Sequence, residues 1–340
     1  ISPTIIHVWP STGFPLGAAS AVGPLLRMRS AHFLVMPAWT IERPGSSAAL
    51  AAAARSYLVD HPKHRLTFLC NTPRETELMS AEGEAAVTLN QNCLVDDMAF
   101  RPLPGVEPVY DAVYNARLAP EKRHELAVEI ENLALVYFYN AYEGSLQAFH
   151  ERHARYMALL PAARFVNPLT PDGCRRLPKQ EVNQVLAQSK VGLCLSAFEG
   201  AMRAAIEYLF AGLPVVSTPS MGGRDRYFDD EFCLIAPPDP RSIRDAVLAL
   251  IARNLPRDYV RAKTLARVEA DRRRYIALVQ DMIDRAGGRE QFSDRFWKCT
   301  RAETIMRWRS MVEFSATLGE TLSHLASIPG QSGNSPDQAG

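Results

Sequence analysis

The chain has 340 residues, of which 47% are hydrophobic and 22% are charged, and its formal net charge is +1. This composition is typical of a globular chain of about two domains and excludes wholesale disorder, a collagen-like rod and a coiled coil. The balance of 38 basic against 37 acidic residues argues against a nucleic-acid-binding surface along the whole chain. The apolar runs are far shorter than the ~20 residues of a membrane-spanning helix.

Short apolar runs alternate with helical patterns along most of the chain. Strands are predicted at residues 4–8, 33–36, 66–70, 86–89, 112–114, 134–138, 191–195, 215–217 and 233–235. Helices are predicted at residues 47–59, 121–130, 146–159, 201–211 and 243–252. Most of these strands are continuously apolar, as expected of parallel strands that are buried on both faces. The alternation therefore predicts an α/β fold with doubly wound parallel sheets.

Two breaks in this alternation predict the domain organisation. A Pro- and Gly-rich segment interrupts it at residues 101–108, and an all-helical, basic pattern replaces it after residue 253. We expect a short N-terminal domain at residues 1–105, a second domain at 106–255, a helical extension at 256–327 and a flexible tail at 328–340. The tail is rich in Gly, Ser, Pro and Asp, which cannot form a packed core.

The most informative segment begins with the predicted strand at 191–195. A short loop leads from it into the predicted helix at 201–211, which Gly212 ends. Glu199 lies in the loop and Glu207 lies two turns into the helix. Open α/β sheets bind ligands at the carboxyl ends of strands, and helix N-termini attract anions, so both carboxylates are candidates for ligand contacts. The spacing alone fits equally well a capping Glu199 and an exposed Glu207.

The pattern Glu199-x7-Glu207, followed by Ala-Gly-Leu-Pro-Val-Val at 211–216 and by Gly222-Gly223, resembles the donor site of retaining GT-B glycosyltransferases. The match is with the large family-4 type, "glycosyl transferases group 1", and runs from about residue 66 to about residue 253. It implies two Rossmann-like domains across a cleft, with Glu199 on the donor sugar and Glu207 on the ribose of the nucleotide. The other donor-binding residues implied are Gly200, Ala201, Met202 and Arg203. Asp239 and the helix after it resemble the family's closing segment.

A second block, residues 114–122, resembles the first strand and turn of the family's nucleotide domain. The resemblance places Arg117 and Lys122 on the donor diphosphate, with Ala116 where the family usually has glycine. An arginine at a strand end and a lysine at a helix start can converge on one anion, the first as a planar fork and the second as a compact charge. Taken alone, the segment also fits a solvated helix surface.

The N-terminal part resembles the family less closely. It is short, and its candidate acceptor-side loop contains Gly13 and Gly17 but no Gly-Gly pair. We infer a shortened acceptor domain or an incomplete chain. His7, at the end of a predicted strand, is a candidate for the catalytic histidine that faces the donor sugar, and His32 is a second candidate. Both histidines also fit purely structural positions.

Other features have structural as well as functional interpretations. His150-x-x-His153 on a predicted helix is a candidate metal pair, although the resemblance implies that no metal is needed. The run Arg272-Arg273-Arg274 is typical of a solvated helix face, and the alternative is contact with an anionic lipid surface. None of the six cysteines forms a CxxC pair, so reduced thiols are expected.

The sequence therefore predicts a metal-independent, hexosyl-type glycosyltransferase (class EC 2.4) without a cofactor, in bacterial-type polysaccharide or glycoconjugate synthesis. Its co-substrate is a nucleotide-diphosphate sugar, and the acceptor is a sugar, a lipid-linked molecule or another hydroxyl compound. Arg117, Lys122 and the helix N-terminus near Ala201 would stabilise the leaving diphosphate. A cytoplasmic location is expected, with peripheral contact at the inner face of the membrane as an option and no nucleic-acid partner. A nucleotide-sugar epimerase and a catalytically weak nucleotide-sugar-binding scaffold are the alternatives.

Overall fold

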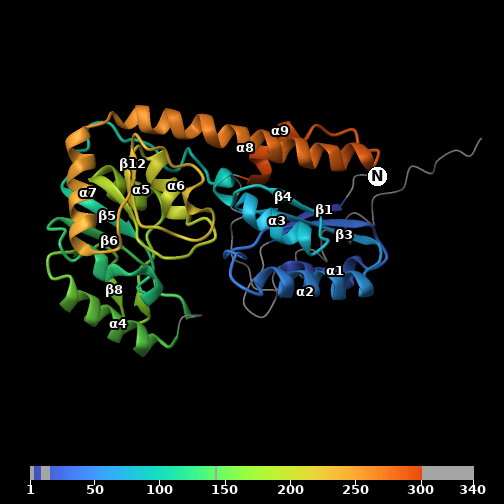
Figure 1. Cartoon of the computed structure of the whole chain (residues 1–340), viewed down its shortest axis with the longest axis horizontal. Coiled ribbons are helices and arrows are strands. Elements are labelled where there is room, and N and C mark those ends of the chain that lie inside the picture. Colours follow the sequence, from blue (N-terminus) through green and yellow to red (C-terminus); the bar gives the residue numbers. More distant parts are fainter. Residues whose placement is uncertain (1–3, 9–15, 142–143, 301–340) are drawn as a thin grey trace, which may run out of the picture.

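The structure, a computed structural model, describes residues 4–8, 16–141 and 144–300. Its main strands form two parallel sheets, each packed with helices, and a long helix runs along both (Figure 1). The first sheet has the order β1-β2-β3-β4 and the second has the order β12-β11-β10-β5-β6-β7. The predicted α/β class with two parallel-sheet units is confirmed.

The first unit is built on four strands that follow one another in chain order. They are β1 (Thr4–Val8), β2 (Ala31–Val35), β3 (His64–Cys70) and β4 (Ala86–Thr88). The connecting helices are α1 (Ala18–Leu26), α2 (Ser46–Asp60) and α3 (Pro73–Ala81). Because crossovers between parallel strands are right-handed, these helices cover one face of the sheet. The other face lies toward α8 (Arg257–Arg285) and α9 (Phe292–Thr300), as Figure 1 shows.

The second unit holds the larger sheet and the segment matched most strongly by the sequence pattern. Its strands are β5 (Tyr110–Asn115), β6 (Leu133–Val136), β7 (Arg164–Phe165), β10 (Ser189–Cys194), β11 (Val215–Ser217) and β12 (Cys233–Ile235). Its helices are α4 (Leu146–Leu159), α5 (Lys179–Ala187), α6 (Arg203–Phe210) and α7 (Pro240–Arg253). The pair β8 (Leu169–Thr170) and β9 (Gly173–Cys174) is antiparallel. The chain winds outward from β5 in one direction and from β10 in the other, which makes this sheet doubly wound.

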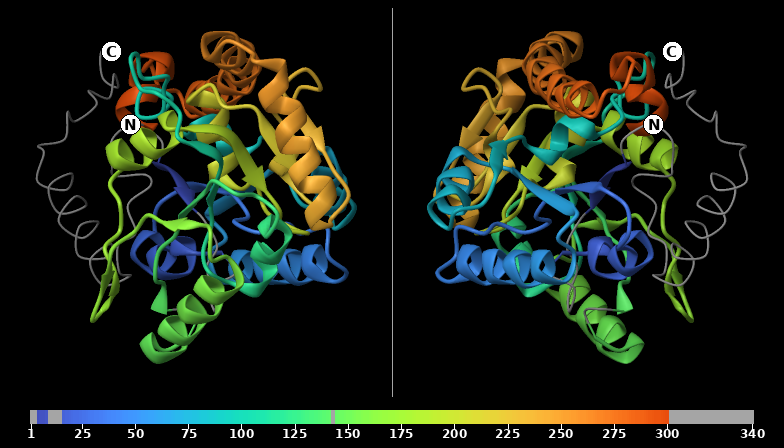
Figure 2. Two further views of the ribbon diagram at one scale, coloured as in Figure 1. Left: turned by 90° about the vertical axis from the view of Figure 1, so that its left-hand side faces the viewer. Right: turned by 90° about the vertical axis from the view of Figure 1, so that its right-hand side faces the viewer.

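The hydrophobic core continues from one unit into the other. In the first sheet, Phe33 and Val35 point into a core formed with α1 and α2, whereas Leu34 points to the opposite face. There Leu34 joins the core of the second unit, which also includes Val260 and Tyr275 of α8. Figure 2 shows from two sides that α8 and α2 lie on opposite sides of the molecule. The two units are therefore packed through α8 as well as directly.

Arg272 corrects the interpretation of the arginine run on α8. Its side chain is 3% exposed and donates to the backbone oxygens of Cys93 and Val95 at 2.9 and 3.1 Å. It also donates to Asp97 Oδ1 at 3.0 Å. The solvated-face interpretation is thus wrong for this residue, because its charge joins α8 to the segment that follows the first sheet. The next residue, Arg273, is exposed.

The predicted helix at 121–130 is wrong. The segment forms two short 3₁₀ turns, η2 (Pro120–Lys122) and η3 (His124–Ala127), separated by Arg123 with a φ of +50°. A left-handed residue interrupts an α-helix. The guanidinium of Arg123 donates to the Leu195 oxygen at 2.5 Å and to Thr218 Oγ1 at 2.6 Å, so contacts with distant loops accompany this conformation.

Other differences from the predicted elements are smaller. Helices α1, α3 and α5 were not predicted, although Thr72 followed by Pro73 is a helix-start signal, and Thr72 does accept from the backbone N–H of Glu75. Helix α6 begins at Arg203, two residues later than predicted. Within the described part of the chain, no helix is long and apolar enough to cross a membrane. The predicted tail at 328–340 and residues 301–327 of the predicted extension lie outside the described residues.

Candidate functional site

The topology of the second sheet marks one edge as the place for a ligand. Its winding reverses between β5 and β10, and open α/β sheets bind ligands in the crevice outside the carboxyl ends of the strands at such a point. Arg117 and Lys122 follow the end of β5, and Glu199 follows the end of β10. The fold therefore brings the predicted cations and the first predicted glutamate to the same edge.

Lys122 and Glu199 bind each other directly. Lys122 Nζ and Glu199 Oε1 form an ion pair, and the two side chains are only 8% and 7% exposed. The hydroxyl of Ser196 donates to the same carboxylate oxygen. The sequence analysis assigned the two charged residues to different parts of a ligand and missed both their mutual contact and Ser196. The pairing compensates two charges that would each be costly to bury alone.

Arg117 lies beside the same pair. Its guanidinium forms an ion pair with Glu121 at 3.3 Å, and its Cζ lies 5.7 Å from the ring centroid of Trp39. Lys122 Nζ lies 5.4 Å from the same centroid. Both predicted cations therefore contact one indole ring, which the loop after β2 of the first unit supplies. No local motif marks Trp39 in the sequence.

Glu207 is not a surface residue, which removes one of the two interpretations left open by its spacing. It is 8% exposed on α6, and Asn115 Nδ2 at the end of β5 donates to its Oε2 at 3.3 Å. Burial raises the pKa of this carboxyl. The positive charges that oppose the rise are those of Arg203, Lys179 and Arg176. The second predicted glutamate thus lies inside the protein at the edge that carries Arg117.

The start of α6 is held from the first unit. Asn92 Nδ2 donates to the backbone oxygen of Ala201 at 2.5 Å, and Met202 precedes the helix with a φ of +42°. The side chain of Met202, the N-cap residue, makes no capping hydrogen bond to the first turn of α6. The backbone N–H groups of a first helical turn attract negative charge, so this terminus adds to the positive potential of the edge.

Glycines allow the loops of the two units to touch at this edge. A Cβ on Gly200 would lie 2.2 Å from the backbone oxygen of Ala38, in the loop after β2. Gly222 has a φ of +100°, and a Cβ there would lie 1.9 Å from the backbone oxygen of Glu199. Gly223 accepts from Asn90 Nδ2 at 2.7 Å, across the two units. The Gly-Gly pair in the sequence pattern is therefore required by close backbone approach.

Two arginines that the sequence analysis did not single out support the loops beneath the Lys122–Glu199 pair. Arg224 is 1% exposed, and its guanidinium donates to the backbone oxygens of Ser196, at 2.7 Å, and Thr218. Arg123 donates to Leu195 and Thr218, as described above. Arg224 thus binds carbonyl groups of the loops that follow β10 and β11, and Arg123 binds a carbonyl group of the first loop and a threonine hydroxyl of the second. For Arg224, the sequence showed only that a charged residue directly follows the Gly222-Gly223 pair.

The structure places the weaker candidates of the first unit as follows. His7 Nδ1 lies 3.1 Å from the hydroxyl of Tyr275 on α8, and burial lowers its pKa to about 3. His32 Nε2 lies 2.8 Å from a threonine hydroxyl on β3. Gly17 precedes α1 with a φ of +54°, and Gly13 lies outside the described residues. A catalytic role of His7 and an acceptor-side role of the glycines stay predictions.

One histidine of the candidate metal pair His150-x-x-His153 has a hydrogen-bond partner within the fold. His153 is buried, and its Nε2 lies 3.0 Å from the hydroxyl of Tyr137. Among the residues that the structure describes, no group of three or more His, Cys, Asp or Glu is placed to hold a metal ion. The metal independence of the reaction stays a prediction.

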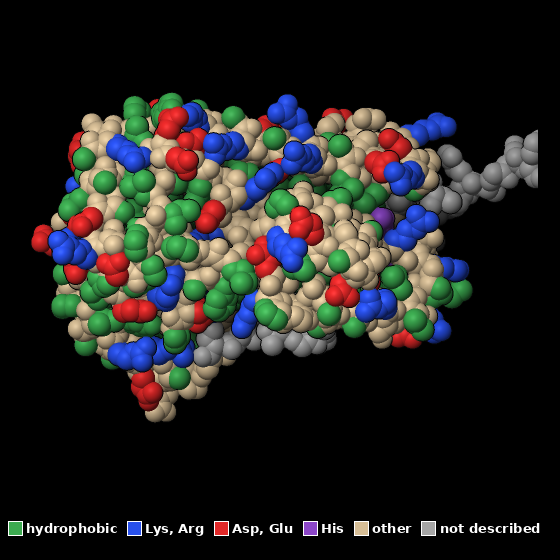
Figure 3. Space-filling view, viewed as in Figure 1, with side chains coloured by type: hydrophobic (Ala, Val, Ile, Leu, Met, Phe, Trp, Pro, Cys, Tyr) green, Lys and Arg blue, Asp and Glu red, His purple; other side chains and the backbone are tan. Residues whose placement is uncertain are grey.

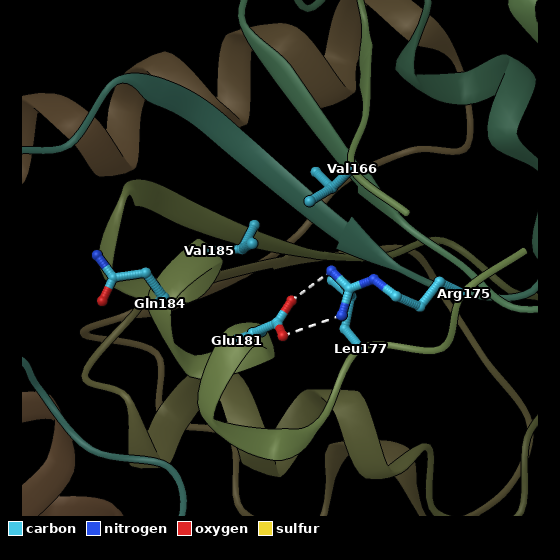
Figure 4. Close-up of a pocket in the computed structure, with 6 residues that line it drawn as sticks. All are labelled: Val166, Arg175, Leu177, Glu181, Gln184 and Val185. Carbon is cyan, nitrogen blue, oxygen red and sulfur yellow. Dashed lines mark hydrogen bonds and ion pairs between the residues drawn. The ribbon is translucent and has the colours of Figure 1, made fainter. Parts of the chain in front are cut away.

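A small surface pocket of about 210 Å³ lies between β7 and α5, and none of its lining residues is a predicted site residue (Figure 4). It is lined by Val166, Arg175, Leu177, Glu181, Gln184 and Val185. Arg175 and Glu181 bind each other in a bidentate ion pair at 2.9 and 2.7 Å, so its charged side chains are already paired. On the face seen in Figure 3, basic and acidic side chains are interspersed, without a large patch of one sign.

Comparisons with known proteins show a partial family match and a similar fold. Residues 160–253 match the model of a family described as "Glycosyl transferases group 1". Sucrose-phosphate synthase from Thermosynechococcus elongatus is similar in structure, with a TM-score of 0.55 and 17% identity, over 83% of this chain and 73% of that one. No curated protein sequence matches the chain.

Two further solved structures are similar over most of this chain. The pneumococcal O-GlcNAc transferase GtfA, in complex with UDP and GlcNAc, has a TM-score of 0.53 and 15% identity, over 81% of this chain and 56% of that one. TarM has a TM-score of 0.54 and 14% identity, over 81% of this chain and 54% of that one. At these identities the likeness shows the fold, with its two Rossmann-like units.

Proposed function

We propose that this chain is a group 1 glycosyltransferase with the GT-B fold, which moves a sugar from a nucleotide-diphosphate donor to a hydroxyl acceptor with retention and without a metal. The observation that carries the proposal is the meeting of Arg117, Lys122 and Glu199 at the edge where the second sheet reverses its winding. Two cations beside a carboxylate fit a departing diphosphate next to a sugar. GtfA is described with bound UDP, so UDP is the first nucleotide to test.

Donor binding would exchange partners within the Lys122–Glu199 pair. Lys122 would turn to the diphosphate, and Glu199 would accept hydrogen bonds from hydroxyls of the donor sugar. Until then each residue compensates the charge of the other, so neither stays buried without a partner. Arg117 would add a planar pair of donors to the same anion, and the first turn of α6 would add its N–H groups.

Glu207 would bind the ribose of the donor nucleotide. An ionised carboxylate accepts several hydrogen bonds, and two neighbouring ribose hydroxyls can donate to its two oxygens. Its burial beside β5 and its contact with Asn115 hold the carboxylate at the edge of the sheet. The remaining donor-binding assignments, to Gly200, Ala201, Met202 and Arg203, follow from the same loop and helix start.

Retention rests on the family resemblance. In that mechanism the acceptor hydroxyl attacks the anomeric carbon from the face that the diphosphate leaves. The bond from the acceptor oxygen to the anomeric carbon forms while the bond to the diphosphate oxygen breaks, and the acceptor proton passes to the departing diphosphate. Arg117 and Lys122 would stabilise the charge that grows on that leaving group, which is the role a metal has in other transferases.

Incubation with a panel of UDP-, GDP- and ADP-sugars tests the proposal. Transfer, or slow hydrolysis that releases the nucleoside diphosphate, is expected, and it should persist in EDTA. Inversion of the sugar while it stays on the nucleotide would identify the epimerase alternative, and binding without turnover would identify the scaffold. NMR of the anomeric proton in the product distinguishes retention from inversion. A strict requirement for Mn²⁺ or Mg²⁺ would contradict the metal-independent mechanism.

Peripheral contact with an anionic membrane is part of the proposal through the exposed residues Arg273 and Arg274 of α8. Because Arg272 is buried and paired with Asp97, only the other two arginines of the run could contact the membrane. Each basic residue near an anionic surface contributes about 1 kcal/mol. Co-sedimentation with vesicles that contain anionic lipid, against vesicles of neutral lipid, measures it.

A further inference from the structure

Trp39 belongs to the first unit but faces the predicted diphosphate site of the second. It lies in the loop that follows β2, and 45% of its surface is exposed. Arg117 Cζ and Lys122 Nζ lie 5.7 and 5.4 Å from its ring centroid. A cation within about 6 Å of an indole face is attracted by the quadrupole of the ring. One side chain thus contacts both cations of the proposed diphosphate site.

These contacts leave the cations able to bind an anion. A guanidinium that lies over a ring uses its flat face for that contact, and its N–H groups point outward in its own plane. A lysine ammonium has three N–H donors, and the contact with Glu199 uses one of them. Arg117 and Lys122 can therefore stay on the indole of Trp39 and still donate to phosphate oxygens.

The loop that carries Trp39 is held on both sides of the residue. Asn71 Nδ2 donates to the backbone oxygen of Pro37 at 3.0 Å, and Glu75 Oε1 accepts from the backbone N–H of Ile41 at 3.2 Å. The ring itself lies 6.3 Å from the ring of Phe198, next to Glu199. A loop anchored in this way can set the position of side chains on the opposite unit.

We propose that Trp39 is a positioning residue that holds Arg117 and Lys122 in place for the donor diphosphate. The inference rests on the proposed function, and it adds that the diphosphate site is complete only when the first unit is packed against the second. The first unit then contributes to donor binding as well as to the acceptor side. Trp39 would act through the two cations, without touching the donor.

Binding of nucleoside diphosphates to Trp39 variants of the full chain tests the proposal. UDP, GDP and ADP are titrated into wild type, Trp39→Ala and Trp39→Phe by calorimetry. For the nucleotide that wild type binds, we expect Trp39→Ala to bind roughly 3- to 30-fold more weakly, the range that one or two cation–π contacts give. Trp39→Phe keeps an aromatic ring that attracts cations less strongly than an indole, so it should bind the nucleotide more tightly than Trp39→Ala but less tightly than wild type.

A matched control is Tyr259→Ala on α8. Tyr259 is 38% exposed and lies with its ring centroid 5.2 Å from Lys263 Nζ, so this variant removes a similar contact at a residue outside the proposed site. Its nucleotide affinity should equal that of wild type. Melting temperatures of all variants show whether any loss of binding reflects unfolding.

The outcomes separate this inference from the proposed function. If none of the three nucleotides binds wild type, the proposed function fails and the inference fails with it. If wild type binds but Trp39→Ala binds equally well or more tightly, only the inference is overturned. An unchanged nucleotide affinity with a raised KM for the acceptor alone would show that the ring is a platform for the acceptor instead. A loss in Trp39→Ala without recovery in Trp39→Phe would also contradict the role of the ring face.

Discussion

Two buried ion pairs in this molecule show how differently a buried cation can be used. Arg272 of α8 binds the backbone oxygens of Cys93 and Val95 in addition to Asp97. Lys122 pairs with the side chain of Glu199 and lies over the ring of Trp39. Both cations also lie over an aromatic ring, so the difference is in the oxygens: carbonyl groups of folded backbone cannot turn to another partner, whereas a carboxylate side chain can. The first pair therefore joins the two units, and the second is suited to exchange with a ligand.

Removing Arg272 should have the largest effect, and it should act on stability. Arg272→Ala removes one ion pair of the buried Asp97 and the donor of two backbone carbonyl oxygens, which is expected to lower the free energy of unfolding by roughly 3–5 kcal/mol. Arg273→Ala, one residue along on the exposed side of α8, should stay within about 0.5 kcal/mol of wild type. Chemical denaturation measures both. Equal stability of the two variants would show that the Arg272 contacts do not hold the units together.

Removing the cations of the site should act on turnover. Arg117→Ala and Lys122→Ala each remove a charge that meets the leaving diphosphate, so kcat should fall by about 10²- to 10³-fold, more than donor affinity. The double variant should be non-additive because both side chains neutralise one anion. Steady-state kinetics and direct nucleoside diphosphate binding measure the two effects. Full turnover in both single variants would place the diphosphate site elsewhere.

A variant of Glu199 tests whether the Lys122–Glu199 ion pair opens when the donor binds or is a fixed structural contact. Glu199→Gln keeps the shape of the side chain but removes its charge, so turnover should collapse if Glu199 orients the donor sugar. Binding of the free nucleoside diphosphate should not weaken, because Lys122 is released from the carboxylate. Calorimetry of wild type and variant makes the comparison. Weaker diphosphate binding in Glu199→Gln would mean that the pair is a fixed structural contact like that of Arg272.

Glu207 should give an intermediate effect on binding. If it holds the ribose, Glu207→Ala loses hydrogen bonds to a charged group worth about 1.5–3 kcal/mol, or about 10- to 150-fold in nucleotide affinity. Titration with the nucleoside diphosphate measures the loss. Asp245→Ala is a matched control, because Asp245 is an exposed carboxylate on α7 that pairs with Arg244 and has no assigned role in the site. Unchanged affinity in Glu207→Ala would leave Glu207 without a role in the site.

The smallest effect expected is on the pH dependence of binding. Burial raises the pKa of Glu207 above its ordinary value, and only the ionised carboxylate accepts hydrogen bonds from both ribose hydroxyls. Affinity should therefore fall as the pH drops through this raised pKa, at a higher pH than an exposed glutamate would cause. The nucleotide affinity of wild type and of Glu207→Gln is measured as a function of pH. Ionisation of the ligand's phosphates affects both proteins equally, so any difference between the two profiles at acidic pH is due to Glu207. Profiles that run parallel at acidic pH would contradict the assignment.

Much of the site was predictable because it depends on topology. Residues that follow the ends of parallel strands meet at one edge whatever the details of packing, and the structure does bring Arg117, Lys122 and Glu199 to one edge, while their roles toward a donor stay predictions. Predicting Glu207 needed more than its spacing, since helical periodicity allows it to be exposed or buried. Arg123 and Arg224 were missed because they bind backbone oxygens of distant loops, which no sequence motif marks. Ser196 was missed because its contact with the Glu199 carboxylate depends on how the loop after β10 folds.

The sequence by itself determined the strands of the parallel sheets and the positions of the chemical groups along them, since apolar runs and strand ends are local properties. Only the tertiary structure decided which groups touch. Lys122 meets Glu199 across 77 residues of chain, and Arg272 reaches Asp97 across 175. The left-handed turn at Arg123, which removed a predicted helix, accompanies contacts with loops of similar separation. Contacts at such distances along the chain depend on how the two sheets and α8 pack, and local sequence carries no record of that packing.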